Sequence, residues 1–332
     1  MPLECLLHMI DEYSGEMAIE INAYNDFDAF SRDVRDIDGQ MLLKDTKCPM
    51  WTNRHIELCG VHVQIGSLGS GNIVEGKSSS DGYLIYMPLS QACEHTVNGI
   101  TFDVHSILVM EPGSDVCLSV TGPHERCTIF IPTQKIVRYG DNQSMLTVDK
   151  DPACRVVRVT PQLVRQVRSF IHNSESAASI DSKFELSPAA TIAAAEAVRV
   201  VFLIIAERRH ADPKREGRPR TSRQEIIRRC KELLEERGVR RIKVEEMATK
   251  AEVSERTLQA VFKEYFGVGP ARYMQLWHLR QINIALQAAQ PNGNTVAEIL
   301  SRKGEWQFGR FAERYRRLFG ESPSQTLQRQ QH

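Results

Sequence analysis

The same pattern of apolar, turn and capping residues occurs twice between residues 244 and 319. Before the turn of the first copy stand Met247 and Ala248, and 52 positions later stand Ile299 and Leu300. The matching residues after the turn are instead 53 positions apart, so one residue has been added in the second turn. A chain that repeats such a pattern is predicted to form two similar helix-turn-helix units.

Regular spacing after each turn indicates a helix with one apolar face. Residues four apart share a face of a helix, and the apolar residues recur at that spacing: Leu258, Phe262 and Phe266, then Phe311, Tyr315 and Phe319. Residue types that begin helices precede the helices of both copies: Ser254, and Thr295 with Glu298. Each run is followed by a glycine that ends a helix and a proline that can begin the next one: Gly267, Pro270, Gly320 and Pro323. We therefore expect residues 223–332 to be all-helical.

These motifs resemble those of a known protein family. They include Ser254-Glu255-Arg256-Thr257-Leu258, Tyr265-Phe266-Gly267, Gly309-Arg310-Phe311-Ala312 and Leu318-Phe319-Gly320-Glu321-Ser322-Pro323. Over about the last third of the chain they resemble the DNA-binding domain of the AraC/XylS family of bacterial transcription regulators. Within it they are most similar to the branch that includes ethanolamine-operon regulators. The resemblance implies two helix-turn-helix units joined by a long central helix, here residues 271–289.

Five positions depart from the family pattern. They are Glu252 in place of the turn glycine, Ala260 and Glu313 at positions that often contact bases, Leu300 in place of a small alanine, and Glu305 in place of a core phenylalanine. An unpaired buried carboxylate is costly. We therefore expect Glu305 to turn to solvent and Trp306 to supply the missing apolar bulk.

Charge is distributed unevenly along the chain. Residues 208–332 contain 26 Lys and Arg against 15 Asp and Glu, a net charge of +11, whereas the remainder has 16 against 27, a net charge of −11. The overall net charge of zero hides this asymmetry. A basic helical region attracts phosphate groups independently of base sequence, so the C-terminal part is predicted to bind double-stranded DNA.

Side chains opposite the apolar helix faces are the candidates for DNA contact. Arginine and glutamine suit the major-groove edges of guanine and adenine, and an aromatic ring can touch a thymine methyl. The candidates for base contact are Arg256, Gln259, Trp306, Gln307, Phe308 and Arg310. The candidates for contact with the DNA backbone are Ser254, Lys263 and Arg314. The alternative is an ordinary solvated helix face or, for the two aromatic residues, core packing.

The first half of the chain is predicted to form strands after a short helix at residues 27–37. Alternating apolar and polar residues indicate half-buried strands at 56–58, 61–65, 83–89, 107–110, 116–120 and 126–131. Asn98-Gly99 favours a tight hairpin turn. We expect a cupin-like β-barrel or jelly roll to about residue 135, which makes the fold class α+β.

In the AraC/XylS family the N-terminal half is commonly a cupin-like sensor that binds a small molecule, dimerises, or does both, so the resemblance implies such a role here. Side chains that could enclose an effector inside a barrel are Trp51, His62, Tyr86, Met87 and Met110. The alternative is that they are ordinary core. The histidines are scattered, without a paired H-x-H, so we predict no metal site, no cofactor and no enzyme.

Helical spacing returns at residues 160–210, where Ala193, Ala197, Val200 and Val201 contribute to one apolar face. That face suits packing on the barrel or dimerisation, and both can hold. Residues 211–222 contain prolines, a glycine and basic residues, which is typical of a linker. We therefore predict a sensor and dimerisation domain at 1–210, a linker at 211–222 and a DNA-binding domain at 223–332.

The eight cysteines form no C-x-x-C pair and have no regular spacing, which argues against a zinc framework. Buried unreactive thiols are the expectation, with redox sensing as the alternative. The longest dense apolar run, Val198–Ala206, is far shorter than the ~20 residues needed to span a membrane. The N-terminus lacks the basic start of a signal peptide, so we expect a cytoplasmic protein without membrane association.

Together these patterns favour a transcription regulator that binds promoter or operator DNA. We expect an activator that responds to a small-molecule effector through its N-terminal domain, contacts RNA polymerase and forms a homodimer. The alternative is an effector-independent repressor or architectural protein whose barrel only dimerises. An enzyme in the barrel, anchored by the DNA-binding part, is a third hypothesis.

Overall fold

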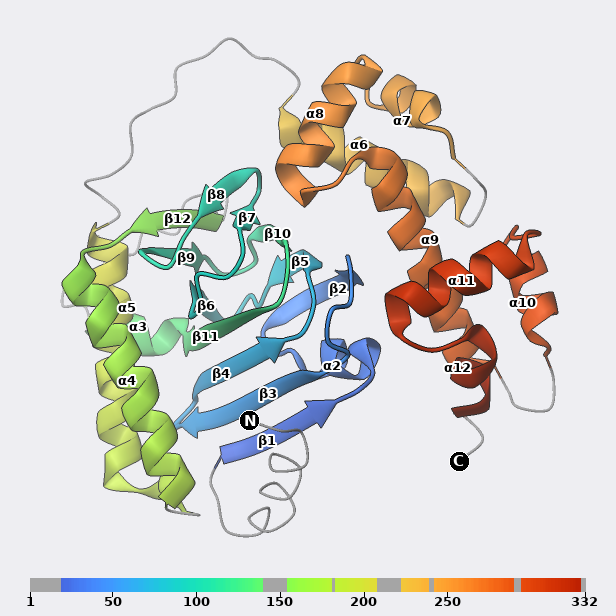
Figure 1. Cartoon of the computed structure of the whole chain (residues 1–332). Helices are drawn as coiled ribbons and strands as arrows, with labels where there is room; N and C mark the ends of the chain where they lie inside the picture. The colour runs from blue at the N-terminus through green and yellow to red at the C-terminus, as the bar shows by residue number, and fades with distance from the viewer. Residues whose placement is uncertain are drawn as a thin grey trace.

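The computed structural model describes residues 19–139, 154–180, 183–207, 222–238, 242–289 and 294–329. A sheet-rich N-terminal part precedes an all-helical C-terminal part, which lies along one side of it (Figure 1). The expected α+β class and the helical character of the described part of 223–332 are confirmed. The predicted linker at 211–222 lies outside the described residues except for Ser222, which caps the first C-terminal helix.

The N-terminal strands that the structure describes form two antiparallel sheets. The seven-stranded sheet has the order β1-β3-β4-β11-β6-β9-β12, with β1 Ile19–Tyr24, β3 Trp51–Leu58, β4 Val61–Leu68, β11 His124–Pro132, β6 Gly82–Pro88, β9 Ser106–Met110 and β12 Cys154–Arg158. The five-stranded sheet has the order β2-β5-β10-β7-β8, with β2 Ile37–Leu43, β5 Asn72–Ser78, β10 Asp115–Val120, β7 His95–Val97 and β8 Ile100–Phe102.

A closed barrel is not formed, and the expectation of one was wrong. Each sheet ends in two edge strands, and no ladder joins one sheet to the other among the described strands. The sequence signal for individual strands was correct, because every predicted strand segment lies on an observed strand. The hairpin at Asn98-Gly99 is also confirmed, since both residues have positive φ angles of 48° and 82°, as the tight turn requires.

Strand β11 shows how alternation divides the apolar residues between two cores. Ile129 and Ile131 face outward and join a core with helices α4 Pro161–Ile180 and α5 Pro188–Glu207. Phe130 faces the opposite way, toward the space between the sheets, and joins a different core with Trp51 and Tyr86. The two helices therefore cover the outer face of the larger sheet (Figure 1).

Helix α5 contains the one helical segment among the described residues that is both long and strongly apolar. By length and composition Pro188–Ile205 could cross a membrane, but 44% of it is buried inside the protein. Its buried residues, including Val201 and Ile204, pack in the same core as the larger sheet. The expected packing role of this helix is thus confirmed, and Ile192, 71% exposed, lies outside that contact.

Seven helices are found in the described residues of the C-terminal part. They are α6 Arg223–Arg237, α7 Val244–Lys250, α8 Glu255–Phe266, α9 Pro270–Gln287, α10 Val296–Arg302, α11 Phe308–Phe319 and α12 Pro323–Arg329. The expected central helix is α9, which begins with Pro270 at its first turn and ends two residues before the predicted boundary. Figure 1 shows α9 running between the unit of α7 and α8 and the unit of α10 and α11.

Two buried carboxylates of the N-terminal part hold α9. Glu75 on β5 accepts a hydrogen bond from the Tyr273 hydroxyl at 2.7 Å. Asp28, on the short helix α2 Phe27–Asp33, pairs with Arg280 at 3.0 Å and accepts a hydrogen bond from Asn283. Buried charges need such partners, so these contacts fix how the helical part is seated on the smaller sheet.

Candidate nucleic-acid interface

The first helix-turn-helix unit is built by α7 and α8. The turn is closed by the Val253 amide, which donates to the Ala248 carbonyl at 3.0 Å, and it places Glu252 at a φ of 58°. That left-handed conformation favours glycine, which explains why the family pattern has glycine at this position. Ser254 then caps α8, because its side chain accepts a hydrogen bond from the Thr257 amide at 3.2 Å.

One face of α8 is buried and the other is open. Leu258 and Phe262 pack in the core of this unit, whereas Arg256, Gln259 and Lys263 are exposed. The amide oxygen of Gln259 lies over the backbone at the start of α9, where a Cβ added to Gly269 would be 2.7 Å from it. The predicted DNA-facing side chains of the first unit therefore share an accessible surface, with Ser254 exposed at its beginning.

The second unit repeats the geometry with α10 and α11. Here the Glu305 amide donates to the Leu300 carbonyl at 2.9 Å, and Gly304 has a φ of 72°. Leu300 corresponds to Ala248, so Glu305 is the counterpart of Val253 and Gly304 the counterpart of Glu252. The second turn thus has the glycine that the first one lacks.

Trp306 is the residue added in the second turn. Positions up to Glu305 match the first unit at an offset of 52, whereas Gln307, which precedes α11, matches Ser254 at an offset of 53. Trp306 is left between these two segments and is 73% exposed. An inserted indole directly before α11 is a conspicuous exposed aromatic group on a polar surface.

The expectation for Glu305 and Trp306 was wrong in both parts. Glu305 is only 2% exposed, and Trp306 does not fill a core position. The carboxylate is buried because it has partners: it accepts from the Gln307 amide at 3.0 Å and pairs with Arg314 at 3.2 Å. It stands near the start of α11, where negative charge is favoured by the helix dipole. The signal that sequence reasoning missed was Arg314, nine positions further on.

The remaining candidates of the second unit lie on the exposed side of α11. Gln307, Phe308 and Arg310 are exposed, whereas Phe311 and Tyr315 are fully buried. Arg314 is partly exposed and bound to Glu305. Two exposed arginines that the sequence analysis did not name, Arg316 and Arg317, lie in the last turn of the same helix. Glu313 is also exposed and pairs with Arg317 at 2.9 Å.

The five residues considered for an effector do not surround one space. Trp51, Tyr86 and Met110 belong to the core between the sheets, but Met87 points the other way, into the core beneath α4 and α5. His62 is partly exposed beside Asp36 and Glu57, and these carboxylates raise its pKa to about 9. A sensor role for these five residues remains a prediction.

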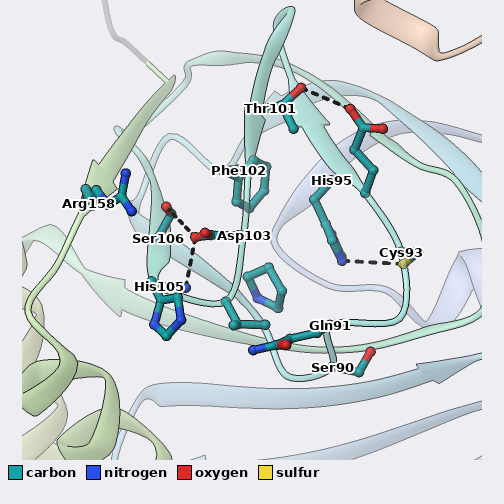
Figure 2. A pocket seen from close by; sticks show the side chains of 13 residues that line it. Ser90, Gln91, Cys93, His95, Thr101, Phe102, Asp103, His105, Ser106 and Arg158 are labelled. Atoms are coloured by element: carbon teal, nitrogen blue, oxygen red, sulfur yellow. Dashed lines mark hydrogen bonds between the residues drawn. The ribbon is translucent and has the colours of Figure 1, made fainter.

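An open pocket of about 500 Å³ lies elsewhere in the N-terminal part. Figure 2 shows it between the loop after β6 and the β7–β8 hairpin, with His95, Phe102 and Arg158 among its lining residues. His95 is held by the Tyr86 hydroxyl, 2.9 Å from Nδ1, and Cys93 lies 3.7 Å from Nε2. Burial lowers the pKa of His95 to about 3, so its ring is neutral at physiological pH. Among the described residues, no cluster suits a metal ion.

Comparison with known proteins finds matches concentrated in the C-terminal part. The helix-turn-helix domain family matches residues 247–329. The XylDLEGF operon transcriptional activator of Pseudomonas putida is 36% identical over 99 residues, which cover 30% of this chain and 31% of that protein. A probable thc operon regulatory protein of Rhodococcus erythropolis is 31% identical over 142 residues, which cover 43% of this chain and 42% of that protein.

These alignments thus span well under half the length of the two relatives. Among solved structures, the AraC-like transcriptional activator CuxR matches with a TM-score of 0.42 and 10% identity, over 79% of this chain and 94% of that one.

Proposed function

Because the C-terminal part of this chain is a DNA-binding domain of the AraC/XylS family, we propose that the protein is a sequence-specific regulator of transcription. The observation that carries the proposal is the pair of helix-turn-helix units, each with an exposed reading surface. The first offers Arg256 and Gln259, and the second offers the segment Trp306–Arg310. In this proposal these side chains read base edges, while Ser254 and Lys263 contact the phosphate backbone and Arg314 contributes a weaker contact while it stays paired with Glu305.

The central helix sets the separation of the two readers. Its 18 residues span about 27 Å at a rise of about 1.5 Å per residue. Successive major-groove faces on one side of B-DNA are about 34 Å apart. With one reader beyond each end of α9, both units can engage one side of the same duplex.

The N-terminal part is proposed to act as a sensor. Its double sheet serves as a cupin-like platform that binds a small-molecule effector and adjusts DNA binding or contact with RNA polymerase. Its direct hydrogen bonds to α9, through Glu75 and Asp28, support this role because they join the two parts physically. A protein of this kind works in the cytoplasm as an activator, without catalysis or a cofactor.

A homodimer formed through α5 is part of the same proposal. Ile192 is 71% exposed on α5, and Leu203 lies exposed on the same helix. Pairing of two copies along this helix would cover both side chains, and would place two DNA-binding parts on one operator. Sedimentation of the full chain, with Ile192→Glu as the variant, tests this arrangement.

The deciding experiment is a binding titration of the full chain on DNA from upstream of its own gene, with excess random competitor, at two salt concentrations. A regulator gives saturable binding that survives the competitor, with an affinity that falls as salt rises. Binding that disappears with competitor would contradict sequence specificity and leave a general DNA-binding protein.

The alternative is an effector-independent repressor or architectural protein. It differs from the proposed activator in the sign of regulation and in having no response to a small molecule. A reporter promoter with the mapped operator measures the sign of regulation, and an added effector measures the response. Activation that changes with a small molecule supports the sensor. Constant repression with unchanged DNA affinity supports the alternative, in which the double sheet only holds a dimer together.

A further inference from the structure

A short loop of the N-terminal part, residues 44–46, contacts the second helix-turn-helix unit and the central helix. The loop follows strand β2, which lies beside α9 (Figure 1). The Thr46 hydroxyl donates to the carbonyl of Leu318 in the last turn of α11. The guanidinium of Arg272, near the start of α9, donates to the Lys44 carbonyl at 3.2 Å. The loop is therefore attached both to the second unit and to the helix that joins the two units.

The same loop reaches the first unit through Lys44. Its ammonium group donates to the Ser119 hydroxyl on β10 at 3.1 Å. That hydroxyl in turn donates to the carbonyl of Phe266, the last residue of α8, at 2.9 Å. The ammonium also lies close to Gly267, where an added Cβ would be 2.9 Å from Nζ. A cation near the carboxyl end of a helix is favoured by the helix dipole, so Lys44 and Ser119 together hold the end of α8.

These contacts are made at the carboxyl ends of α8 and α11, away from the candidates for base contact. The last four carbonyls of a helix have no partner within that helix. Ser119 and Thr46 each supply a donor to one such carbonyl, in α8 and α11 respectively. Arg256 and Gln259 lie in the first half of α8, residues 307–310 lie at the start of α11, and all of them are exposed. The N-terminal part therefore holds both helices without covering the proposed reading surfaces.

The loop is itself fixed to the turn between β4 and β5. The Lys44 amide donates to the Gly71 carbonyl at 2.9 Å, and the Asp45 carboxylate accepts from the Gly71 amide at 2.8 Å. Just beyond the loop, the Cys48 amide donates to the Gly69 carbonyl at 3.0 Å. An added Cβ at Gly69 would be 2.0 Å from the Cys48 carbonyl oxygen, so this close approach of two backbone segments needs glycine. A loop anchored in this way acts as a rigid spacer rather than as a flexible tether.

The two units have separate cores, so their relative placement is not fixed by direct packing alone. Phe262 packs against Tyr273 near the start of α9, whereas Phe311 belongs to a different core further along the chain. An open cleft of about 490 Å³ is lined by residues of both units, among them Val244 and Glu305. Long helices are seldom straight, so bending of α9 would change how the units face one another. The loop provides a second connection that opposes such bending.

We propose that the 44–46 loop is a strut that sets the placement of α11 relative to α8, so that the N-terminal part determines the spacing of the two DNA segments that the units read. Thr46 and Ser119 are the positioning residues, because they join the N-terminal part to the two helix ends. One base pair of B-DNA advances the helix by about 3.4 Å and about a tenth of a turn. A fixed pair of helices therefore accepts one spacing. This inference rests on the proposed sequence-specific DNA binding and needs no effector.

The test uses the full chain and a pool of random-sequence DNA duplexes, from which the bound duplexes are selected and sequenced. We expect the wild type to select two short motifs at one fixed separation. Titrations then compare the best duplex with duplexes that have one base pair more or one fewer between the motifs. The wild type should lose at least about tenfold in affinity when the spacing changes, which is similar to the effect of a mismatched base pair.

Thr46→Val and Ser119→Ala each remove one hydroxyl that holds a helix end. Each variant should keep both motifs and the wild-type discrimination within each motif, because the reading side chains are unchanged. The affinity loss on changed spacing should shrink by about threefold or more, which is the contribution of one net hydrogen bond. The matched control is Ser78→Ala, which removes a buried hydroxyl that donates to the Glu111 carbonyl at 2.6 Å within the N-terminal part. It should lower the melting temperature about as much as Ser119→Ala does and keep the wild-type spacing requirement.

Two results would overturn the strut alone. One is an unchanged spacing requirement in both folded variants, which would mean that α9 by itself sets the separation. The other is an equal relaxation in Ser78→Ala, which would mean that any loosening of the N-terminal part has the same effect. Failure of the proposed function has a different signature, because a wild type that selects no motif would reject sequence-specific binding and the strut together.

Discussion

The two helix-turn-helix units have the same plan but stabilise the start of their second helices differently. Helices α8 and α11 both have 12 residues and end in a left-handed glycine. Helix α8 begins with Ser254 as an ordinary side-chain cap, whereas no side-chain cap is formed by Gln307 before α11. There the buried carboxylate of Glu305 accepts the hydrogen bond from the chain instead.

The difference shows how a repeated motif can absorb an insertion. Adding Trp306 lengthens the second turn, and the side chain at the preceding core position has become a carboxylate that ties the lengthened turn to Arg314. The first unit keeps the shorter turn but has Glu252 in a left-handed conformation. Each unit therefore has one departure from an ideal turn. In the first unit the cost is backbone strain at Glu252, and in the second it is the burial of the Glu305 carboxylate.

Replacing Glu305 should have the largest effect on this comparison. Glu305→Ala removes the hydrogen bond at the start of α11 and leaves Arg314 without its partner, so we expect unfolding free energy to fall by about 2–3 kcal/mol. Chemical denaturation of the full chain measures the change. The matched control is Glu313→Ala on the exposed side of the same helix, which should change stability by less than about 0.5 kcal/mol. Equal losses for both variants would mean that burial of Glu305 is unimportant.

The next prediction compares base contact by the first unit with base contact by the second unit. Arg256→Ala and Trp306→Ala each remove an exposed side chain at a proposed reading surface. We expect each to weaken operator binding by about 1–3 kcal/mol and to relax sequence preference in a different half of the site. Titrations on single-base operator variants locate the affected positions. If Trp306→Ala binds every operator variant as the wild type does, the inserted indole is not a reader.

The turn residues offer a pair of opposite substitutions. Glu252→Gly should stabilise the chain by about 1 kcal/mol, because glycine adopts the left-handed conformation without strain. The reciprocal change, Gly304→Ala, should destabilise it by a similar amount, about 1 kcal/mol, for the same reason. Glu252 also pairs with Arg229 at 2.8 Å, but it is largely exposed, so the lost ion pair subtracts little. Denaturation midpoints of the two variants should move in opposite directions.

What the sequence predicted well was determined locally. Helix starts and stops depend on residues within one turn of each other, and Ser254, Thr295, Gly267 and Gly320 all cap helices as expected. Individual strands were also predicted correctly, because the alternation of apolar and polar residues depends only on neighbouring positions. Strands β1, β2, β5 and β12 were not predicted, because interrupted alternation and edge positions weaken the local signal.

What the sequence did not predict depends on residues distant along the chain. Whether strands close into a barrel is decided by which strand ends up beside which, and that order is not encoded in any one segment. Burial of Glu305 likewise depends on Arg314 meeting it across the turn. Polar residues inside a core are therefore the places where pattern reasoning fails first.

The smallest expected effect is on contact with DNA phosphates. The two units differ here in whether the basic side chain already has an ion-pair partner. Lys263 on α8 is exposed, whereas Arg314 on α11 is held by Glu305. Lys263→Ala should weaken binding to operator and random DNA equally, and should lower the slope of log affinity against log salt by about 1, without changing stability. Arg314→Ala should lower stability instead, because it removes the guanidinium that pairs with the buried carboxylate at 3.2 Å. Since Glu305 already neutralises Arg314, its removal should change the salt slope by less than that of Lys263. A full unit of slope lost in Arg314→Ala, with stability unchanged, would show that Arg314 leaves Glu305 for a phosphate when DNA binds, and that the two units contact the backbone alike.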